Sequence, residues 1–190
     1  MKKDAHQLLN ELTGELKGIL TTIVELKQLP PKQLNYKPSP EIWSILECVE
    51  HLNLYGDFYL PKIEQTILQS KHTEKSNYIF KSGILGNYFA KSMLPKQGVI
   101  KNKMKTFTDK NPANSNLTTI CLDRFVKQIE KMIHLLEMAK TVNISKTKTA
   151  ISISKLIRLK LGDTFRFNIN HIHRHMFQIK NIKNSFETKI

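Results

Sequence analysis

Apolar residues recur at helical spacing in four stretches of the chain, with polar residues between them. Successive members of each stripe stand three or four positions apart, which places them on one face of a helix. The pattern predicts long helices over residues 5–28, 45–70, 118–139 and 162–185. Four amphipathic helices of this length are typical of a bundle. The predicted fold class is therefore all-α, a four-helix bundle.

Helix breakers and caps set the predicted ends of the first two helices. The segment PPKQLNYKPSPEIW contains four prolines, and these predict an extended connection rather than a helix. Ser44 and Glu47 then form an S-x-x-E capping box ahead of the second apolar stripe. Pro61 falls inside that stripe and predicts a kink or a break in the second helix.

The remaining stretches carry weaker patterns. Residues 71–117 contain Gly83, Gly86 and Gly98 together with many lysines, so we expect an irregular or inserted segment with at most short helices around Tyr88–Met93. A Lys/Ser/Thr-rich linker follows the third helix, and a short helical piece is predicted near Ser154–Leu159. We see no strong strand signal and no internal repeat. Residues 1–190 are therefore predicted to form a single domain.

Length and composition narrow the class of protein. A chain of 190 residues with 40% hydrophobic content can bury a sizeable core. Its apolar runs are shorter than the ~20 residues that a membrane span needs, and the N-terminus lacks the apolar stretch of a secretory signal. Two cysteines, Cys48 and Cys121, do not make a disulfide framework. We therefore expect a cytoplasmic protein without a membrane partner.

The formal net charge is +14, from 30 basic and 16 acidic residues. This charge fits either a nucleic-acid or other polyanion partner, or a lysine-rich surface without such a partner. The lysines are spread along the chain, and aromatic residues do not alternate with them as on a stacking platform. We therefore favour a lysine-rich surface without a polyanion partner. The charge also suits a small anionic substrate or cofactor.

The last predicted helix carries two neighbouring stripes. One is an ordinary apolar face, and the other is polar. The polar stripe consists of Thr164, Asn168, His171, His175 and Gln178. A polar stripe beside a core face is what a buried polar site between helices requires. His173 projects nearly opposite to His171 and cannot join that site.

A third histidine, His51, lies on the flank of the second helix in WSILECVEHL. Spacing alone admits two readings: a three-His metal site with an open position, or ordinary satisfied and exposed histidines. Ligand imidazoles need partners that orient them. Glu47, one turn before His51, could be such a partner or could only complete the helix cap. Asn168 and Gln178 could hold a bound water or substrate.

Two stretches of the chain resemble the DinB-like family of metal-dependent proteins. WSILECVEHL resembles the family's Trp-Ser start of the second helix ending in His-Leu, and LGDTFRFNINHIHRHMFQI resembles its His-x-x-Arg-His-x-x-Gln last helix. The resemblance implies a four-helix bundle with a long crossover connection. It also implies a divalent metal ion, nickel or zinc, held by His51, His171 and His175.

The resemblance further implies an enzyme that acts on a small-molecule substrate. Characterised relatives include S-transferases and an isomerase that use a low-molecular-weight thiol, and others are called hydrolases. We therefore expect a thiol transferase or a metal-dependent hydrolase, with the catalytic residues not identified. The alternative is a non-catalytic basic module that binds nucleic acid or another polyanion. Apolar flanks and the habit of the family also point to a homodimer.

Overall fold

The computed structural model describes residues 1–72, 78–95, 99–100, 106–113, 115–152 and 154–187, without the side chains of residues 155 and 187. The protein is mostly helical. Its helices, single-turn 3-10 segments (η) and strands are β1 Lys2–Asp4, α1 Ala5–Leu26, α2 Pro31–Leu34, α3 Ile45–Leu68, β2 Ile79–Lys81, α4 Ile84–Met93, η1 Thr108–Lys110, α5 Ile120–Met138, η2 Ala139–Thr141, β3 Lys148–Ile151, β4 Ser154–Lys160 and α6 Leu161–Glu187.

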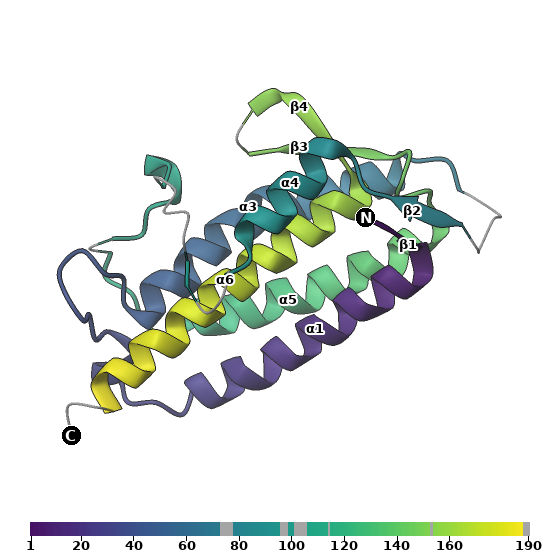
Figure 1. The fold of residues 1–190 in the computed structure, drawn as a ribbon. Helices are drawn as coiled ribbons and strands as arrows, with labels where there is room; N and C mark the ends of the chain where they lie inside the picture. Colours follow the sequence, from purple (N-terminus) through teal and green to yellow (C-terminus); the bar gives the residue numbers. More distant parts are fainter. Residues whose placement is uncertain (73–77, 96–98, 101–105, 114, 153, 188–190) are drawn as a thin grey trace.

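The long helices α1, α3, α5 and α6 pack side by side (Figure 1). Helix α3 contacts α5 and α6, and α1 contacts the same two helices from the other side. Their apolar stripes meet in one buried core, in which Leu16, Tyr59, Phe125 and Phe165 are fully or almost fully buried. The 3.6-residue periodicity of the sequence therefore located the long helices.

Local signals account for the ends of the first long helices. The Asp4 side chain accepts a hydrogen bond from the Gln7 backbone N–H, at 2.9 Å, and caps α1. The capping box at α3 is present in both directions, because Ser44 accepts from Glu47 N–H and the Glu47 carboxylate accepts from Ser44 N–H. Helix α3 continues past Pro61 without a break, so the tertiary contacts of its buried face override the local cost of the proline.

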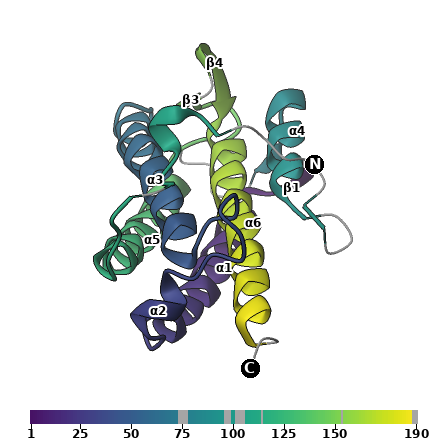
Figure 2. The ribbon, with the colours of Figure 1, turned by 90° about the vertical axis from the view of Figure 1, so that its left-hand side faces the viewer.

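The connection between α3 and α5 carries β2, α4 and η1. Helix α4 lies on the outer side of α6 (Figure 2). This helix is longer than the expected piece around Tyr88–Met93 and begins at Ile84. Parts of the segment 71–117, including Gly98, lie outside the described residues.

The predicted all-α class holds in that the protein is mostly helical, but two small antiparallel sheets are also present, for which no strong strand signal was seen. Strand β1 pairs with β2, and β3 pairs with β4 in a hairpin at the end where α6 begins (Figure 1). The hairpin occupies the residues for which a helical piece near Ser154–Leu159 was expected. Thr149, Ile151 and Leu159 are buried while Leu156 is exposed, which is the alternation of a strand. The period-two signal was there in the β-branched Thr147, Thr149 and Ile151.

The proline-rich connection is also not wholly extended. Pro31–Leu34 forms one helical turn, with Pro31 at the first helical position, where its missing N–H costs nothing. Leu34 on this turn is buried. Within the described ranges, no helix combines the length and the apolar composition that a membrane span needs.

Candidate metal centre

Three buried imidazoles from two helices meet between α3 and α6. His51 lies two turns into α3, at a position that the capping box at Ser44 fixes. His171 and His175 lie one turn apart on α6, and all three residues are buried. The potential ligand atoms of the three lie within 4.8 Å of one another. The structure thus brings together two sequence segments 120 positions apart.

The nitrogens that face one another are the Nε2 atoms. Nε2 of His171 lies 3.3 Å from Nε2 of His51 and 3.0 Å from Nε2 of His175. Nitrogens bound to one tetrahedral zinc ion stand roughly 3.3 Å apart, because each Zn–N bond is ~2.0–2.1 Å long. The spacing of the imidazoles therefore fits a common ion, and this three-His group could hold a metal.

The outer nitrogens show which ring atoms carry the protons. Nδ1 of His51 donates to the backbone carbonyl of Lys110 at 2.7 Å, and Nδ1 of His175 donates to the side-chain oxygen of Gln178 at 3.1 Å. A neutral imidazole carries one N–H, so Nε2 of both rings presents a lone pair to the cluster. A single proton on His171 could bridge only one of the two short N···N contacts. A cation would satisfy both.

The electrostatics keep all three rings neutral. Burial, opposed in part by the Lys110 carbonyl, lowers the pKa of His51 to about 4. Burial also holds the pKa of His171 and His175 well below the usual value, and the neighbouring rings and the positive charge of Arg174 lower it further. Neutral imidazole is the form that binds a metal ion.

Two aromatic rings flank the imidazoles. The Trp43 ring lies against His51 and His175, with centroid distances of 4.8 and 6.0 Å. The Tyr55 ring lies against His51 and His171, at 4.9 and 4.6 Å. Burial raises the pKa of Tyr55 to about 12, with smaller effects from Tyr59 and Asp109, so its hydroxyl stays protonated and can donate.

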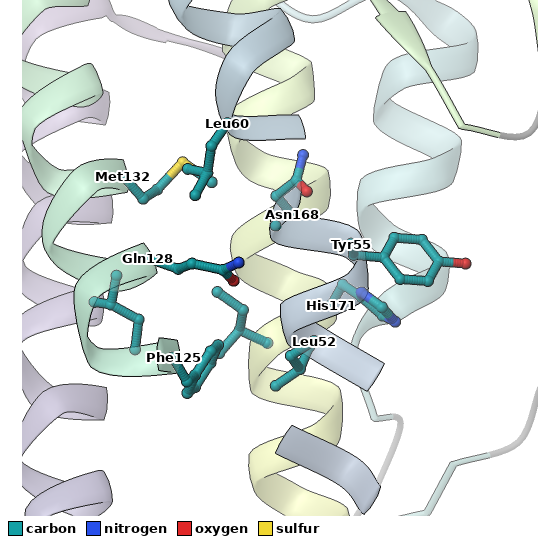
Figure 3. Close-up of a pocket in the computed structure, with 11 residues that line it drawn as sticks. Leu52, Tyr55, Leu60, Phe125, Gln128, Met132, Asn168 and His171 are labelled. Atoms are coloured by element: carbon teal, nitrogen blue, oxygen red, sulfur yellow. The ribbon is translucent and has the colours of Figure 1, made fainter. Parts of the chain in front are cut away.

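A narrow cavity of about 20 Å³ lies behind the cluster, between α3, α5 and α6, with room for about one water molecule. Its walls include Leu52, Phe125, Met132, Asn168 and His171. Figure 3 shows the Tyr55 and His171 rings pointing to the same side of α3, away from Phe125 and Met132. Tyr55 and His171 both line this cavity, so the cavity borders the three-His group.

Of the three polar residues predicted to support the site, Glu47, Asn168 and Gln178, only Gln178 is seen to bond to one of the imidazoles. The Glu47 carboxylate accepts from Ser44 N–H and pairs with Lys37 at 3.1 Å, while Nδ1 of His51 is bonded to Lys110. The Asn168 amide donates to the Thr164 carbonyl one turn back, at 2.8 Å. Gln178 lies against His175, as described above. His173 points to the other side of α6 and contacts Glu15 at 2.8 Å.

Sequence reasoning did not find the role of Lys110. Its contribution to His51 is a backbone carbonyl, which every residue type supplies, so no residue pattern signals it. Trp43 and Tyr55 also border the imidazoles. The common signal for these two was their position: one aromatic residue stands before the capping box and the other stands one turn after His51.

The mostly helical fold and the three converging imidazoles on two helices place this protein among candidate metal-binding proteins. Residues 20–179 match the DinB superfamily. Because the match covers most of the chain, the protein belongs to this superfamily. Searches of curated proteins and of solved structures found no match.

Proposed function

We propose that the protein is a metal-dependent enzyme in which His51, His171 and His175 bind one divalent ion, nickel or zinc. The observation that supports this proposal best is the orientation of the rings, since the Nε2 lone pairs converge while Nδ1 of two rings is held from outside. Three protein ligands leave a coordination position for an exchangeable guest, which is the arrangement of catalytic rather than structural sites.

The reaction that we favour is the transfer of a low-molecular-weight thiol to a small electrophilic substrate. A divalent ion at this position would lower the pKa of a bound thiol and so supply the nucleophilic thiolate. Lys110 and Gln178 would hold His51 and His175 in the ligating tautomer. Trp43 and Tyr55 would shield the site from bulk water, and the protonated Tyr55 hydroxyl would be a donor to a group on the substrate.

The scaffold that we propose is a four-helix bundle of α1, α3, α5 and α6, with the long crossover connection between α3 and α5. The mutual contacts of these helices support it. Both cysteines, Cys48 and Cys121, are free and buried, which agrees with a reducing, cytoplasmic location. A homodimer stays a prediction, and sedimentation of the purified chain would test it.

The first experiment is metal analysis of protein purified without chelator, together with a His171→Ala variant. We expect about one ion per chain in the native protein, and at least about a 100-fold loss of affinity in the variant because one of three ligands is gone. His173→Ala is the matched control, since His173 stands two residues away on the other face of α6. Stoichiometric metal in the His171→Ala protein would contradict the ligand assignment.

A hydrolase would use the same three ligands with an activated water in place of the thiol. The two activities separate in one assay series on the metal-loaded protein. We expect product formation from a generic electrophile only when a thiol is added. Cleavage of an ester or amide without any thiol would favour the hydrolase instead.

A second candidate is a non-catalytic module that binds a polyanion, which the net charge of +14 would suit. This candidate predicts binding to nucleic acid that falls steeply with salt, because phosphate contacts release counterions. Filter binding at two salt concentrations tests it. Absent or salt-independent binding would remove it and leave the enzyme.

A further inference from the structure

Nearly all of the net charge of +14 comes from two segments of the chain. Residues 75–108 contain seven lysines, and residues 138–162 contain five lysines and one arginine. Neither segment contains an aspartate or a glutamate, so the rest of the chain is almost electrically neutral. Most of α5 separates the two segments in the sequence, and only the folded chain decides whether their charges lie together.

The described parts of the two segments pack against each other. The Tyr78 hydroxyl donates to the Val142 carbonyl at 3.0 Å and accepts from Ile144 N–H at 2.8 Å. Nζ of Lys160 in β4 donates to the carbonyl of Lys81 in β2 at 2.6 Å. Helix α4 contacts β4 beside the start of α6 (Figure 1). Lysines that are spread along the sequence are thus gathered at one end of the folded chain.

Helix α4 in this region is apolar on two opposite sides. Its inner side packs against α6 and consists of three buried residues, Gly86, Ala90 and Met93. On the opposite side the side chain of Ile84 is 93% exposed, that of Tyr88 65% and that of Leu85 52%. Helical spacing places Lys91 beside Ile84 and Tyr88 on this outward face. A surface helix normally presents polar residues outward, and an exposed apolar patch marks a site for a membrane or a partner.

Lysines without ion pairs lie beside the outward face of α4. Lys81 stands three residues before Ile84, and both Lys81 and Lys91 are exposed. Lys160 is bonded to the Lys81 carbonyl, and Lys2 is the cross-strand neighbour of Lys81. None of these four lysines forms an ion pair with another described residue. The partner of this surface therefore has to be both apolar and anionic.

We propose that the outward face of α4, together with these lysines, binds the surface of an anionic lipid bilayer. The aliphatic side chains of Ile84 and Leu85 enter the boundary between headgroups and acyl chains, and the ammonium groups stay at the level of the anionic headgroups. A peripheral contact of this kind needs no membrane span. It does not involve the three-His group, so it stands independently of the proposed enzyme.

Two other occupants fit this surface less well. Nucleic acid would pair with the lysines and could stack on an aromatic ring, but it offers nothing to the exposed side chains of Ile84 and Leu85. A second copy of the chain could cover the apolar side chains. A two-fold contact, however, would bring the same cationic segments of the two copies against each other. A lipid surface complements both the apolar and the charged groups.

The test is sedimentation of the full-length protein with lipid vesicles at fixed ionic strength. Vesicles made of equal parts of phosphatidylserine and phosphatidylcholine are compared with vesicles of phosphatidylcholine alone. We expect binding to the anionic vesicles that weakens as salt is added, and at least about 30-fold weaker binding to the neutral vesicles, because several lysines lie near the lipid surface. Equal binding to the two kinds of vesicle, or no binding to the anionic ones, would overturn the proposal.

The apolar part of the contact is tested by Ile84→Gln. This variant should bind the anionic vesicles roughly tenfold more weakly, because the side chain no longer enters the lipid boundary. The matched control is Ile120→Gln, since Ile120 is likewise the first residue of a helix and is 71% exposed. The control should bind as the native protein does. An equal loss in the two variants would exclude the face of α4 as the site of contact.

The charged part is tested by the double variant Lys81→Gln/Lys91→Gln, which should weaken binding by roughly 10-fold to 30-fold. Its control, Lys17→Gln/Lys62→Gln, changes two exposed lysines of α1 and α3 and has the same net charge. The control should lose much less affinity. If both double variants lost the same affinity, net charge alone would drive binding, and the proposed surface would be wrong.

The other two occupants are distinguished by measurements on the same proteins. Binding to duplex DNA that is as strong as binding to the anionic vesicles, and that Ile84→Gln leaves unchanged, would replace the lipid by nucleic acid. A native dimer that Ile84→Gln dissociates in sedimentation velocity would assign the face to a second copy of the chain instead. We expect neither result.

Discussion

Helix α6 carries two buried polar clusters, and they differ in how their hydrogen bonds are satisfied. Near its start, the Asp163 carboxylate accepts from Gly83 N–H at 2.8 Å, from the Ser82 hydroxyl and from Arg166 at 3.1 Å. Arg166 also donates to Ser82 and to Asn87 of α4. The charges of Asp163 and Arg166 are opposite and their hydrogen-bonding groups are paired within the cluster. The cluster thereby holds the start of α4 against α6.

The second cluster lies two turns further along the helix and is built from bases alone. The Nε2 atoms of His51, His171 and His175 face one another, and a single proton on His171 can bridge only one of the two short N···N contacts. A buried group without its partner costs about 1–3 kcal/mol. The comparison suggests how to tell two kinds of buried polar cluster apart. A cluster whose hydrogen-bonding groups are all paired with one another stabilises the packing of helices. A cluster of like groups that cannot all pair with one another indicates a binding site.

The largest effect that would sharpen this contrast is expected from Asp163→Ala. The substitution leaves Arg166 buried without its counter-charge and removes the anchor of Gly83 at the start of α4, so we expect a loss of about 3–5 kcal/mol in the free energy of unfolding. Urea denaturation measures it. Glu137→Ala, which breaks an exposed ion pair, should cost no more than about 1 kcal/mol. Equal losses in the two variants would show that the Asp163 cluster is not structural.

The pH dependence of the metal-free protein probes the second cluster. Burial lowers the pKa of His51 from 6.5 to about 4. Between pH 6.5 and about 4, the unfolded chain therefore binds a proton at His51 that the folded chain does not bind. The free energy of unfolding is highest above pH 6.5 and decreases as the pH falls toward 4. Each such histidine adds a slope of about 1.4 kcal/mol per pH unit in this window.

Urea denaturation at pH 6 and pH 5, with a chelator present, measures this slope. His51→Leu should have a shallower slope by about one proton. Leu52→Ala, the neighbouring residue on α3, should lower stability at both pH values and keep the native slope, because it removes no titratable group. If the stability of His51→Leu depended on pH as steeply as that of the native protein, His51 would not be a neutral ring in the folded state.

A pair of glycine substitutions tests how tightly the Asp163 cluster is packed, and the smallest change in stability is expected from its control, Gly14→Ala. A Cβ at Gly86 of α4 would lie 2.5 Å from the Asp163 carboxyl group, whereas a Cβ at Gly14 of α1 would meet nothing within 4 Å. We expect Gly86→Ala to destabilise by about 1–3 kcal/mol. Gly14→Ala should stabilise by roughly 0.5–1 kcal/mol, because alanine is the better helix former. Thermal melts of both variants decide it; stabilisation by Gly86→Ala would mean that α4 can move away from α6.

The sequence by itself determined the long helices and the faces they bury. Periodicity located α1, α3, α5 and α6, and the capping box marked the start of α3, because these signals act between residues within a few positions of one another. The same local geometry placed His171 and His175 on one face of α6 and His173 on the other. It also set a polar stripe from Thr164 to Gln178 beside the apolar core.

Only the tertiary structure decided which distant groups meet. His51 reaches His171 across 120 positions, Lys110 supplies a carbonyl that any residue would have supplied, and Asp163 anchors Gly83 across 80 positions. The β3–β4 hairpin likewise depends on its packing against α3 and α6. Such contacts follow from how whole helices pack, which no short window of sequence encodes. The histidines were therefore readable as candidates, while their convergence was a property of the folded chain.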